Sequence, residues 1–159
     1  MNLDPLRWHK FYATVKHGDQ KYGFLPYTTH LAAVENVLRR FDVADLDLLG
    51  AAWLHDVCED TGTKVKEIEE LFGEETASIV GAVTNEKGEN RKIRAALTYP
   101  KIRANKKAVI LKLADRIANV ENGGSLVTMY KKEYEDFKRA LYTKDENEEM
   151  WSCLDRLLL

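Results

Sequence analysis

Three carboxylates and one imidazole fall within six residues of the sequence, at His55, Asp56, Glu59 and Asp60. The segment before them is almost entirely apolar, which predicts a buried helix over residues 45–59. At about 100° per residue along that helix, the four side chains share one face. Acids crowded at the end of a buried helix repel one another and lose hydration. A divalent cation would remove both costs; the alternative is a solvated last turn of the helix.

Two further polar side chains lie on helices that are otherwise apolar. His30 belongs to a helix expected over residues 28–40, where it faces inward with the apolar side chains. By itself, an inward histidine is more often a hydrogen-bonded core residue than a metal ligand. Asp115 lies in the middle of a nearly all-apolar helix over residues 108–120. An acid at that position is unexplained by packing alone.

The buried acid at position 115 needs a partner, and three are available. Lys112 and Arg116 lie on the same helix, and a metal ion is the third. The apolar helices that carry these polar groups must pack together, so we expect the polar groups to meet. The predicted metal ligands are His30, His55, Asp56 and Asp115.

The composition is that of an ordinary globular domain. The chain has 159 residues, 45% of them hydrophobic and 31% charged, with a net charge of −2. That length predicts a single domain over residues 1–159, and the small net charge argues against nucleic acid or a membrane as partner. Two cysteines are too few for a disulfide scaffold. With no signal peptide and no apolar run of about 18 residues, we expect a cytoplasmic protein.

Hydrophobic periodicity predicts an all-α fold, a compact bundle of about seven or eight helices. The expected helices cover residues 5–16, 28–40, 45–59, 65–72, 75–84, 108–120 and 126–142, with a short one at the end. The first is expected to begin after a cap at Asp4 and to bury Phe11 and Val15. Gly50, in the middle of the third, predicts a close crossing with another helix.

Two polar segments supply candidate substrate contacts. Residues 18–26 are predicted to form a loop because of their glycines and proline, and they carry Lys21 and Tyr22. In a later basic segment, Arg91 and Arg94 would be neighbours on one helix face, where guanidinium groups suit phosphate oxygens. Each segment has an ordinary alternative: a loop pinned to the core by its aromatic rings, and a solvated basic face.

Several of these motifs resemble those of HD-domain metal-dependent phosphohydrolases. One histidine, then a His-Asp pair, then a distant aspartate is the pattern of that class. Residues 26–30 (PYTTH), 51–61 (AAWLHDVCEDT) and 111–119 (LKLADRIAN) are similar, more narrowly, to the hydrolase domain of the RelA/SpoT alarmone enzymes. The small stand-alone alarmone hydrolases are the most similar in size. The resemblance covers roughly residues 15–137, which is most of the chain.

The resemblance implies an HD-domain helical bundle that binds one divalent metal ion, usually Mn²⁺. The implied metal ligands are the same four residues, His30, His55, Asp56 and Asp115. Glu59 and Asp60 match the acidic pair that handles the attacking water. The implied nucleotide contacts are Lys21 and Tyr22 beside the base, Asn119, and Tyr134 in a weakly aligned helix.

The reaction that the resemblance implies is hydrolysis of the 3′-pyrophosphate of (p)ppGpp to GDP or GTP and pyrophosphate. Arg91, Arg94 or Lys21 would stabilise charge on the diphosphate. Two departures concern the substrate: Tyr22 replaces a usual basic residue, and Glu121 stands where many members have arginine. The alternatives are another nucleotide, such as (p)ppApp, NADPH or a nucleoside monophosphate, and a metal-containing sensor without turnover. The expected partner is thus a small-molecule nucleotide, and a homo-oligomer is compatible with the sequence.

Overall fold

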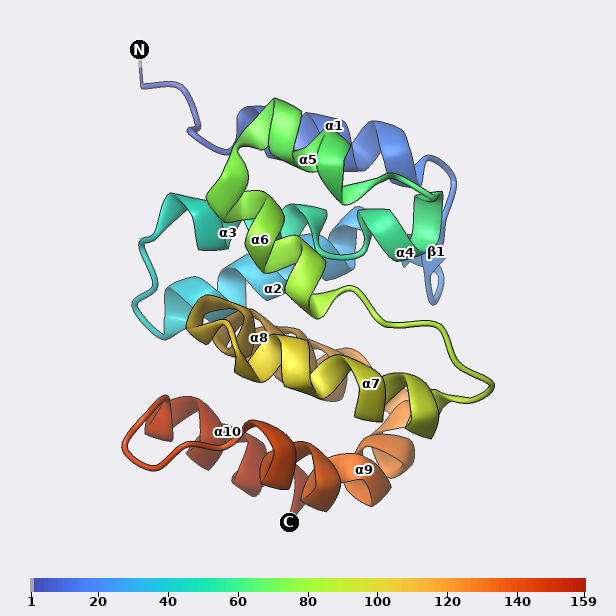
Figure 1. Cartoon of the computed structure of the whole chain (residues 1–159), viewed down its shortest axis with the longest axis vertical. Coiled ribbons are helices and arrows are strands. Elements are labelled where there is room, and N and C mark those ends of the chain that lie inside the picture. Colours follow the sequence, from blue (N-terminus) through green and yellow to red (C-terminus); the bar gives the residue numbers. More distant parts are fainter. Residues whose placement is uncertain (1) are drawn as a thin grey trace.

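The computed structural model describes residues 2–159 and is almost entirely helical (Figure 1). Within these residues it has ten α-helices, one 3₁₀-helix and one two-stranded sheet. The helices are α1 (Arg7–His17), α2 (Thr28–Arg40), α3 (Leu46–Leu54), α4 (Val57–Thr61), α5 (Val65–Phe72), α6 (Glu74–Val83), α7 (Arg91–Arg103), α8 (Lys106–Asn122), η1 (Gly124–Leu126), α9 (Val127–Leu141) and α10 (Glu148–Leu158). The all-α class is confirmed. There are more helices than expected because the 45–59 segment is broken in two and the basic segment forms α7.

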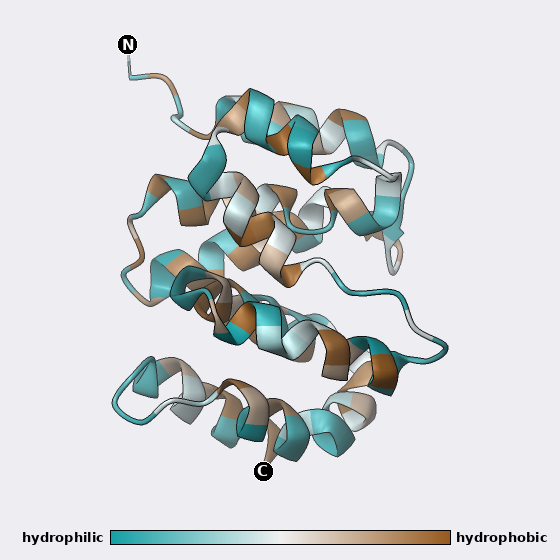
Figure 2. Ribbon diagram, in the orientation of Figure 1, coloured by the Kyte–Doolittle hydropathy of each residue, from teal (hydrophilic) through white to brown (hydrophobic). Residues whose placement is uncertain are grey.

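Helix α8 is the centre of the bundle, between α1 and α5 at one end and α9 and α10 at the other (Figure 1). It contacts α2, α3, α6, α7, α9 and α10, which explains why its sequence is apolar on nearly every side. Its first turn is capped by Asn105, whose side chain accepts a hydrogen bond from the amide of Ala108 at 3.1 Å. Figure 2 shows hydrophobic and hydrophilic residues alternating along the outer helices, as expected for helices with one buried face.

The helix expected over residues 45–59 is interrupted, and this expectation was wrong. Helix α3 ends at Leu54 and α4 begins at Val57, so His55 and Asp56 lie in a turn between two helices. The physical cause is a competing hydrogen bond. Nδ1 of His55 lies 2.8 Å from the carbonyl oxygen of Ala52, the acceptor that a continuous helix would offer to the amide of Asp56.

Helix α1 differs from expectation in its start and in its buried face. It begins at Arg7 rather than Pro5, because Asp4 caps the preceding turn by accepting a hydrogen bond from the amide of Leu6 at 2.9 Å. Phe11 and Val15 were expected to be buried, but they are 62% and 61% exposed. The helix instead buries the face of Leu6, Ala13 and His17, which packs against α3 and α4.

The close helix crossing predicted at Gly50 is confirmed. A Cβ atom at Gly50 would lie 2.6 Å from the ring of His9 on α1. Only a residue without a side chain lets the two helices approach this closely.

The loop expected over residues 18–26 contains a minimal hairpin. Strand β1 (Lys21–Tyr22) pairs antiparallel with β2 (Leu25–Pro26), with Lys21 opposite Pro26. Gly23 turns the chain with a positive φ of 61°, a conformation that glycine adopts without strain. The hairpin carries Tyr22 to the first turn of α2, where its ring stacks on His30. In residues 2–159, every helix is too short or too polar to cross a membrane.

Candidate metal centre and active site

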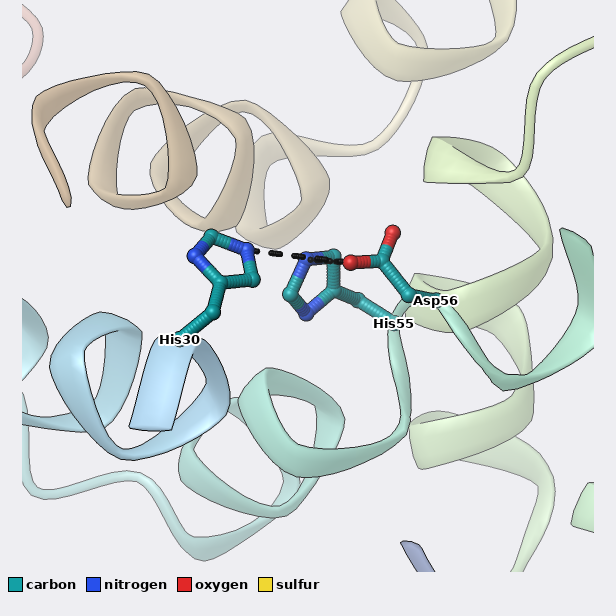
Figure 3. A group of neighbouring side chains, drawn as sticks. All are labelled: His30, His55 and Asp56. Atoms are coloured by element: carbon teal, nitrogen blue, oxygen red, sulfur yellow. Dashed lines mark ion pairs between the residues drawn. The ribbon is translucent and has the colours of Figure 1, made fainter. Parts of the chain in front are cut away.

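Four polar side chains meet between α2, the α3–α4 turn and α8. Potential ligand atoms of His30, His55 and Asp56 all lie within 4.8 Å of one another (Figure 3). Oδ1 of Asp115, on α8, lies 3.1 Å from Nε2 of His30 and 3.4 Å from Nε2 of His55. The structure therefore brings together the four residues that were predicted as metal ligands.

The arrangement of His55 fits a metal ion. Its Nδ1 is engaged by the Ala52 carbonyl, which places the ring proton there and leaves a lone pair on Nε2. That Nε2 atom is buried and has no hydrogen-bond partner within residues 2–159, although it lies only 3.0 Å from Oδ2 of Asp56. A lone pair facing carboxylate oxygens is repulsive without a cation between them. Two imidazole nitrogens and two carboxylates form a donor set that suits a divalent transition metal.

The charges of the cluster shift the pKa values of its own members. Burial lowers the pKa of His55, but the charges of Asp56 and Asp115 outweigh burial and raise that pKa well above its ordinary value. Burial raises the pKa of Asp56, but His55 opposes it and brings the pKa to about 2. Burial also raises the pKa of Asp115, but the charge of Lys112 together with His30 and His55 outweighs burial, so the pKa lies well below its usual range. A cation and a proton on His55 are therefore competing ways to balance the same two carboxylates.

Tyr27 holds the carboxylate of Asp56 in place. Its hydroxyl donates to Oδ2 at 2.5 Å, and its ring packs on His17 with centroids 4.6 Å apart. Burial and then the charge of Asp56 raise the pKa of Tyr27, so the phenol stays protonated and remains a donor. Tyr27 was not among the residues predicted from the sequence. Its position three residues before His30, on the same helix face, was the available signal.

Asp115 is held by residues of its own helix. Nζ of Lys112 lies 3.2 Å from Oδ2, and Nδ2 of Asn119 donates to Oδ1 at 2.9 Å. Of the two side chains considered as partners of the buried acid, Lys112 is the one in contact, whereas Arg116 lies beside Glu133. Oδ1 of Asn119 accepts a hydrogen bond from Tyr22 at 2.8 Å, and the ring of Tyr22 stacks on the α2 histidine of the cluster. Tyr22 and Asn119 are therefore part of the wall of the cluster.

The two acids Glu59 and Asp60 have different surroundings. Glu59 accepts hydrogen bonds from the amide and the side chain of Asn85 at 2.7 and 3.2 Å. Burial is the main cause that raises the pKa of Glu59, and the charge of Asp56 adds to it. Asp60 instead accepts a hydrogen bond from Gln20 at 2.9 Å, near the end of α1. Of the pair, Glu59 lines the cavities beside the cluster, so the single shared face predicted for the acids was wrong.

A cationic cavity of about 250 Å³ lies next to the cluster, on the side of Glu59. Its basic lining residues are Arg91, Arg94, Lys112 and Arg116. Glu59 and Lys112 also line a smaller cavity that reaches the carboxylates of Asp56 and Asp115, so the two cavities adjoin. The structure thus brings together Arg91 and Arg94, the two arginines predicted for phosphate binding. It adds Lys112 and Arg116, which the sequence had suggested only as partners of the buried Asp115. Several fixed cations around one hollow suit the oxygens of a diphosphate.

A second and larger cavity, about 600 Å³, lies on the other side of the cluster. Lys21, Tyr22, Phe24 and Leu126 are among its lining residues, and His30 forms part of its wall. Flat aromatic and apolar side chains suit a nucleotide base better than a phosphate group. The predicted base contacts Lys21 and Tyr22 therefore line this cavity, whereas Arg91 and Arg94 line the cationic one. Lys21, which was also considered for the diphosphate, lies apart from the two arginines.

Two residues singled out from the sequence lie away from these cavities. The hydroxyl of Tyr134 donates to Asp155 at 2.7 Å, which places this residue in the contact between α9 and α10 instead of beside the cluster. Glu121 pairs with Arg40 at 3.0 Å. Glu121, the residue that departs from the family pattern, therefore joins α8 to α2.

The comparisons with known proteins agree with this geometry. A family model described as HD domain matches residues 9–144, most of the chain. The chain belongs to the HD domain family. HD domain hydrolases are metal-dependent, in keeping with the cluster of His30, His55 and Asp56.

Relatives of known name share part of their length with this HD domain chain. A probable guanosine-3′,5′-bis(diphosphate) 3′-pyrophosphohydrolase of Synechocystis sp. is 35% identical over 102 residues, covering 60% of this chain and 13% of that protein. The guanosine-3′,5′-bis(diphosphate) 3′-pyrophosphohydrolase MESH1 of Drosophila melanogaster is 32% identical over 116 residues, covering 70% of this chain and 65% of that protein. The chain thus matches between about an eighth and two-thirds of the length of these relatives.

A solved structure supports the fold over nearly the whole chain. It is described as a metazoan ortholog of SpoT that hydrolyses ppGpp, and it superposes with a TM-score of 0.82 at 24% identity. The match covers 99% of this chain and 96% of that one. The arrangement of helices seen in Figure 1 is therefore shared with that structure.

Proposed function

We propose that this protein is a cytoplasmic, Mn²⁺-dependent hydrolase that removes the 3′-pyrophosphate of (p)ppGpp, giving GDP or GTP and pyrophosphate. The observation that carries the proposal is the place of Glu59. It lines both the small cavity at the metal-ligand carboxylates and the cationic cavity beside it. At that junction Glu59 can accept a proton from a water molecule that attacks a phosphate ester, while the cationic cavity holds the anionic diphosphate. The names of the Synechocystis and Drosophila relatives support the choice of substrate.

The metal would be held by the four residues of the cluster, His30, His55, Asp56 and Asp115. Two imidazoles beside two carboxylates favour Mn²⁺ over Mg²⁺, which prefers oxygen ligands. When bound, such an ion polarises a phosphoryl oxygen and lowers the pKa of water. Tyr27 keeps the Asp56 carboxylate oriented toward the cluster.

Glu59 takes the proton of the attacking water. Its raised pKa, caused mainly by burial, makes it a stronger base than an exposed glutamate, and the Asn85 hydrogen bonds hold it in place. We keep Asp60 as the second acid of the pair, available to protonate the leaving 3′-oxygen. Because Asp60 accepts a hydrogen bond from Gln20, Asp60 would act from the side of α4 that faces α1.

The two larger cavities divide the substrate between them. The diphosphate lies among Arg91, Arg94 and Lys112, which balance its charge as the bond breaks. The base and sugar lie on the other side, against Lys21 and Tyr22. The hydroxyl of Tyr134 is engaged by Asp155 and not by the site. We therefore propose that Tyr134 acts only by supporting helix α9.

A second candidate keeps the site and changes the nucleotide to (p)ppApp, NADPH or a nucleoside monophosphate. It is favoured by Tyr22, which brings a neutral phenol to the base cavity where the resembling family often has a cation. A phenol whose hydroxyl is already engaged by Asn119 selects less strongly for guanine than a free cationic donor would.

A release assay with product identification tests the proposal. The purified protein with Mn²⁺ is offered ppGpp, ppApp, NADPH and nucleoside monophosphates, and the products are separated by ion exchange. We expect GDP and pyrophosphate from ppGpp, and the loss of both metal binding and turnover in Asp56→Ala with its helical circular dichroism retained. Orthophosphate from NADPH, with ppGpp left intact, would establish the second candidate instead.

A further inference from the structure

The cationic cavity contains a carboxylate of the protein itself. Glu133, on α9, lines the cavity together with Arg91. Nε of Arg91 donates to Oε1 of Glu133, and its Nη2 donates to Oε2 at 3.2 Å. The same Oε2 lies 3.4 Å from Nη1 of Arg116. Two guanidinium groups therefore converge on one carboxylate in the hollow that would receive a diphosphate.

Arg116 has an unused donor in this hollow. It is only 4% exposed, and its buried Nη1 has no hydrogen-bond partner in the described part of the chain. The guanidinium carbon lies 4.3 Å from the ring centroid of Phe137 and 4.8 Å from that of Tyr130. These rings hold the cation but accept none of its in-plane hydrogen bonds. A buried cation with a free donor is costly, and Glu133 at 3.4 Å relieves that cost only in part.

A phosphate group would satisfy these donors better than Glu133 does. Carboxylate and phosphate both offer a pair of oxygens that match the fork of a guanidinium group. Phosphate has more acceptor oxygens and more negative charge, so it can serve Arg91, Arg94 and Arg116 together. Glu133 thus occupies the position expected for a phosphate group but satisfies fewer of the arginine donors than a phosphate group would.

The carboxylate of Glu133 also has somewhere to go. A neighbouring cavity of about 330 Å³ lies on the other side of the Arg91–Glu133 pair and shares both residues with the cationic one. Lys92 and Asp136 both line this neighbouring cavity, so it offers a cation beside one further carboxylate. The side chains of Glu133 and Arg91 are 26% and 51% exposed, so the pair lies at the mouth of the hollow and opens without unpacking the core.

We propose that Glu133 is an internal counter-ion that determines which anions the cationic cavity binds. In the free protein it neutralises Arg91 and Arg116, and it competes with small anions such as orthophosphate. A diphosphate group carries enough charge and acceptor oxygens to displace it. The proposal rests on the function proposed above, because that function identifies the natural ligand of the cavity as the diphosphate of a nucleotide.

Calorimetric titration of the Mn²⁺-loaded protein with inorganic pyrophosphate tests the proposal. The variant is Glu133→Gln, which keeps the shape of the side chain and removes its charge. Glu135→Gln is the matched control, because it makes the same change on the same helix at a carboxylate that is 86% exposed and pairs with Arg139. Loss of a full negative charge beside the binding position should tighten pyrophosphate binding roughly ten-fold, while the control stays within about two-fold of the wild type. The gain should disappear when Arg91→Gln is added.

Two results would overturn the proposal. Equal or weaker binding by Glu133→Gln would mean that Glu133 only positions Arg91, and an equal gain in Glu135→Gln would mean a general effect of net charge. If Glu133→Gln does not fold by circular dichroism, Glu133→Asp retracts the carboxylate by one methylene and must also bind pyrophosphate more tightly than the wild type. A gain in pyrophosphate binding without nucleotide hydrolysis would refute the proposed function and leave the role of Glu133 standing.

Discussion

Replacing Tyr27 by phenylalanine removes one hydroxyl from the wall of the metal cluster and leaves the ring in place. The hydroxyl donates to Oδ2 of Asp56 at 2.5 Å, and that same oxygen lies 3.0 Å from Nε2 of His55. A hydrogen bond to a charged, partly buried group contributes about 1.5–3 kcal/mol, which corresponds to a factor of roughly 10–100 in an equilibrium constant. Removal of residues that orient metal ligands costs affinity in the same range. We therefore expect Tyr27→Phe to weaken Mn²⁺ binding by about 10- to 100-fold.

The structure supplies a matched control for this experiment. The hydroxyl of Tyr12 donates to Glu67 at the same distance, 2.5 Å, in the contact between α1 and α5. Tyr12→Phe makes the same chemical change away from the cluster, so its Mn²⁺ affinity should equal that of the wild type. The assay is calorimetric titration of Mn²⁺ into metal-free protein, with circular dichroism as a check on folding. Wild-type affinity in Tyr27→Phe, or an equal loss in both variants, would refute the orienting role of Tyr27.

Three more predictions follow from named contacts. Glu59→Gln should retain Mn²⁺ affinity and lose roughly 10²- to 10⁴-fold in kcat; steady-state kinetics with an unchanged kcat would exclude it as the base. Asp45 caps α3 by accepting from the amide of Leu48 at 3.0 Å, so Asp45→Ala should lower the free energy of unfolding in urea by about 1 kcal/mol at pH 7. The hydrogen bond from Lys107 is the main cause that lowers the pKa of Asp45. The stability that the Asp45 carboxylate contributes is therefore present above the ordinary aspartate pKa and is lost as pH falls through the lowered value. An equal deficit in the variant at pH 7 and pH 2 would contradict this. Gly50→Ala should destabilise by about 1–3 kcal/mol, because the added Cβ meets the His9 ring at 2.6 Å, and a wild-type midpoint in urea would contradict it.

Most of the helices could be predicted from local sequence signals. The apolar periodicity of residues 28–40, 65–72 and 126–142 corresponds closely to α2, α5 and α9, because burial of one face at a period of 3.6 residues is a property of the helix itself. The buried face of α1 could not be predicted in the same way. Phe11 and Val15 are apolar but exposed, since that helix turns toward α3 and α4 the face that carries Ala13, a small residue that allows close approach.

The cluster of candidate metal ligands was predictable for a different reason. Imidazoles and carboxylates on apolar helices are costly unless they meet a partner, so His30, His55, Asp56 and Asp115 indicate a common site from their surroundings in the sequence alone. Sequence also separated Glu59 and Asp60 from the ligands, although only through a resemblance to a family. The assignment of their roles stays a prediction.

What the sequence determined by itself was the type of chemistry: a donor set for a divalent cation, two nearby acids, and arginines suited to phosphate. Tertiary structure alone decided how these groups are shared among cavities, because the atoms involved come from helices far apart in the chain. The side-chain bond from His55 to the carbonyl of Ala52 breaks a helix that periodicity predicts to be continuous. Glu133, a residue without any motif, lies against Arg91 and Arg116 only because α9 packs across α7 and α8.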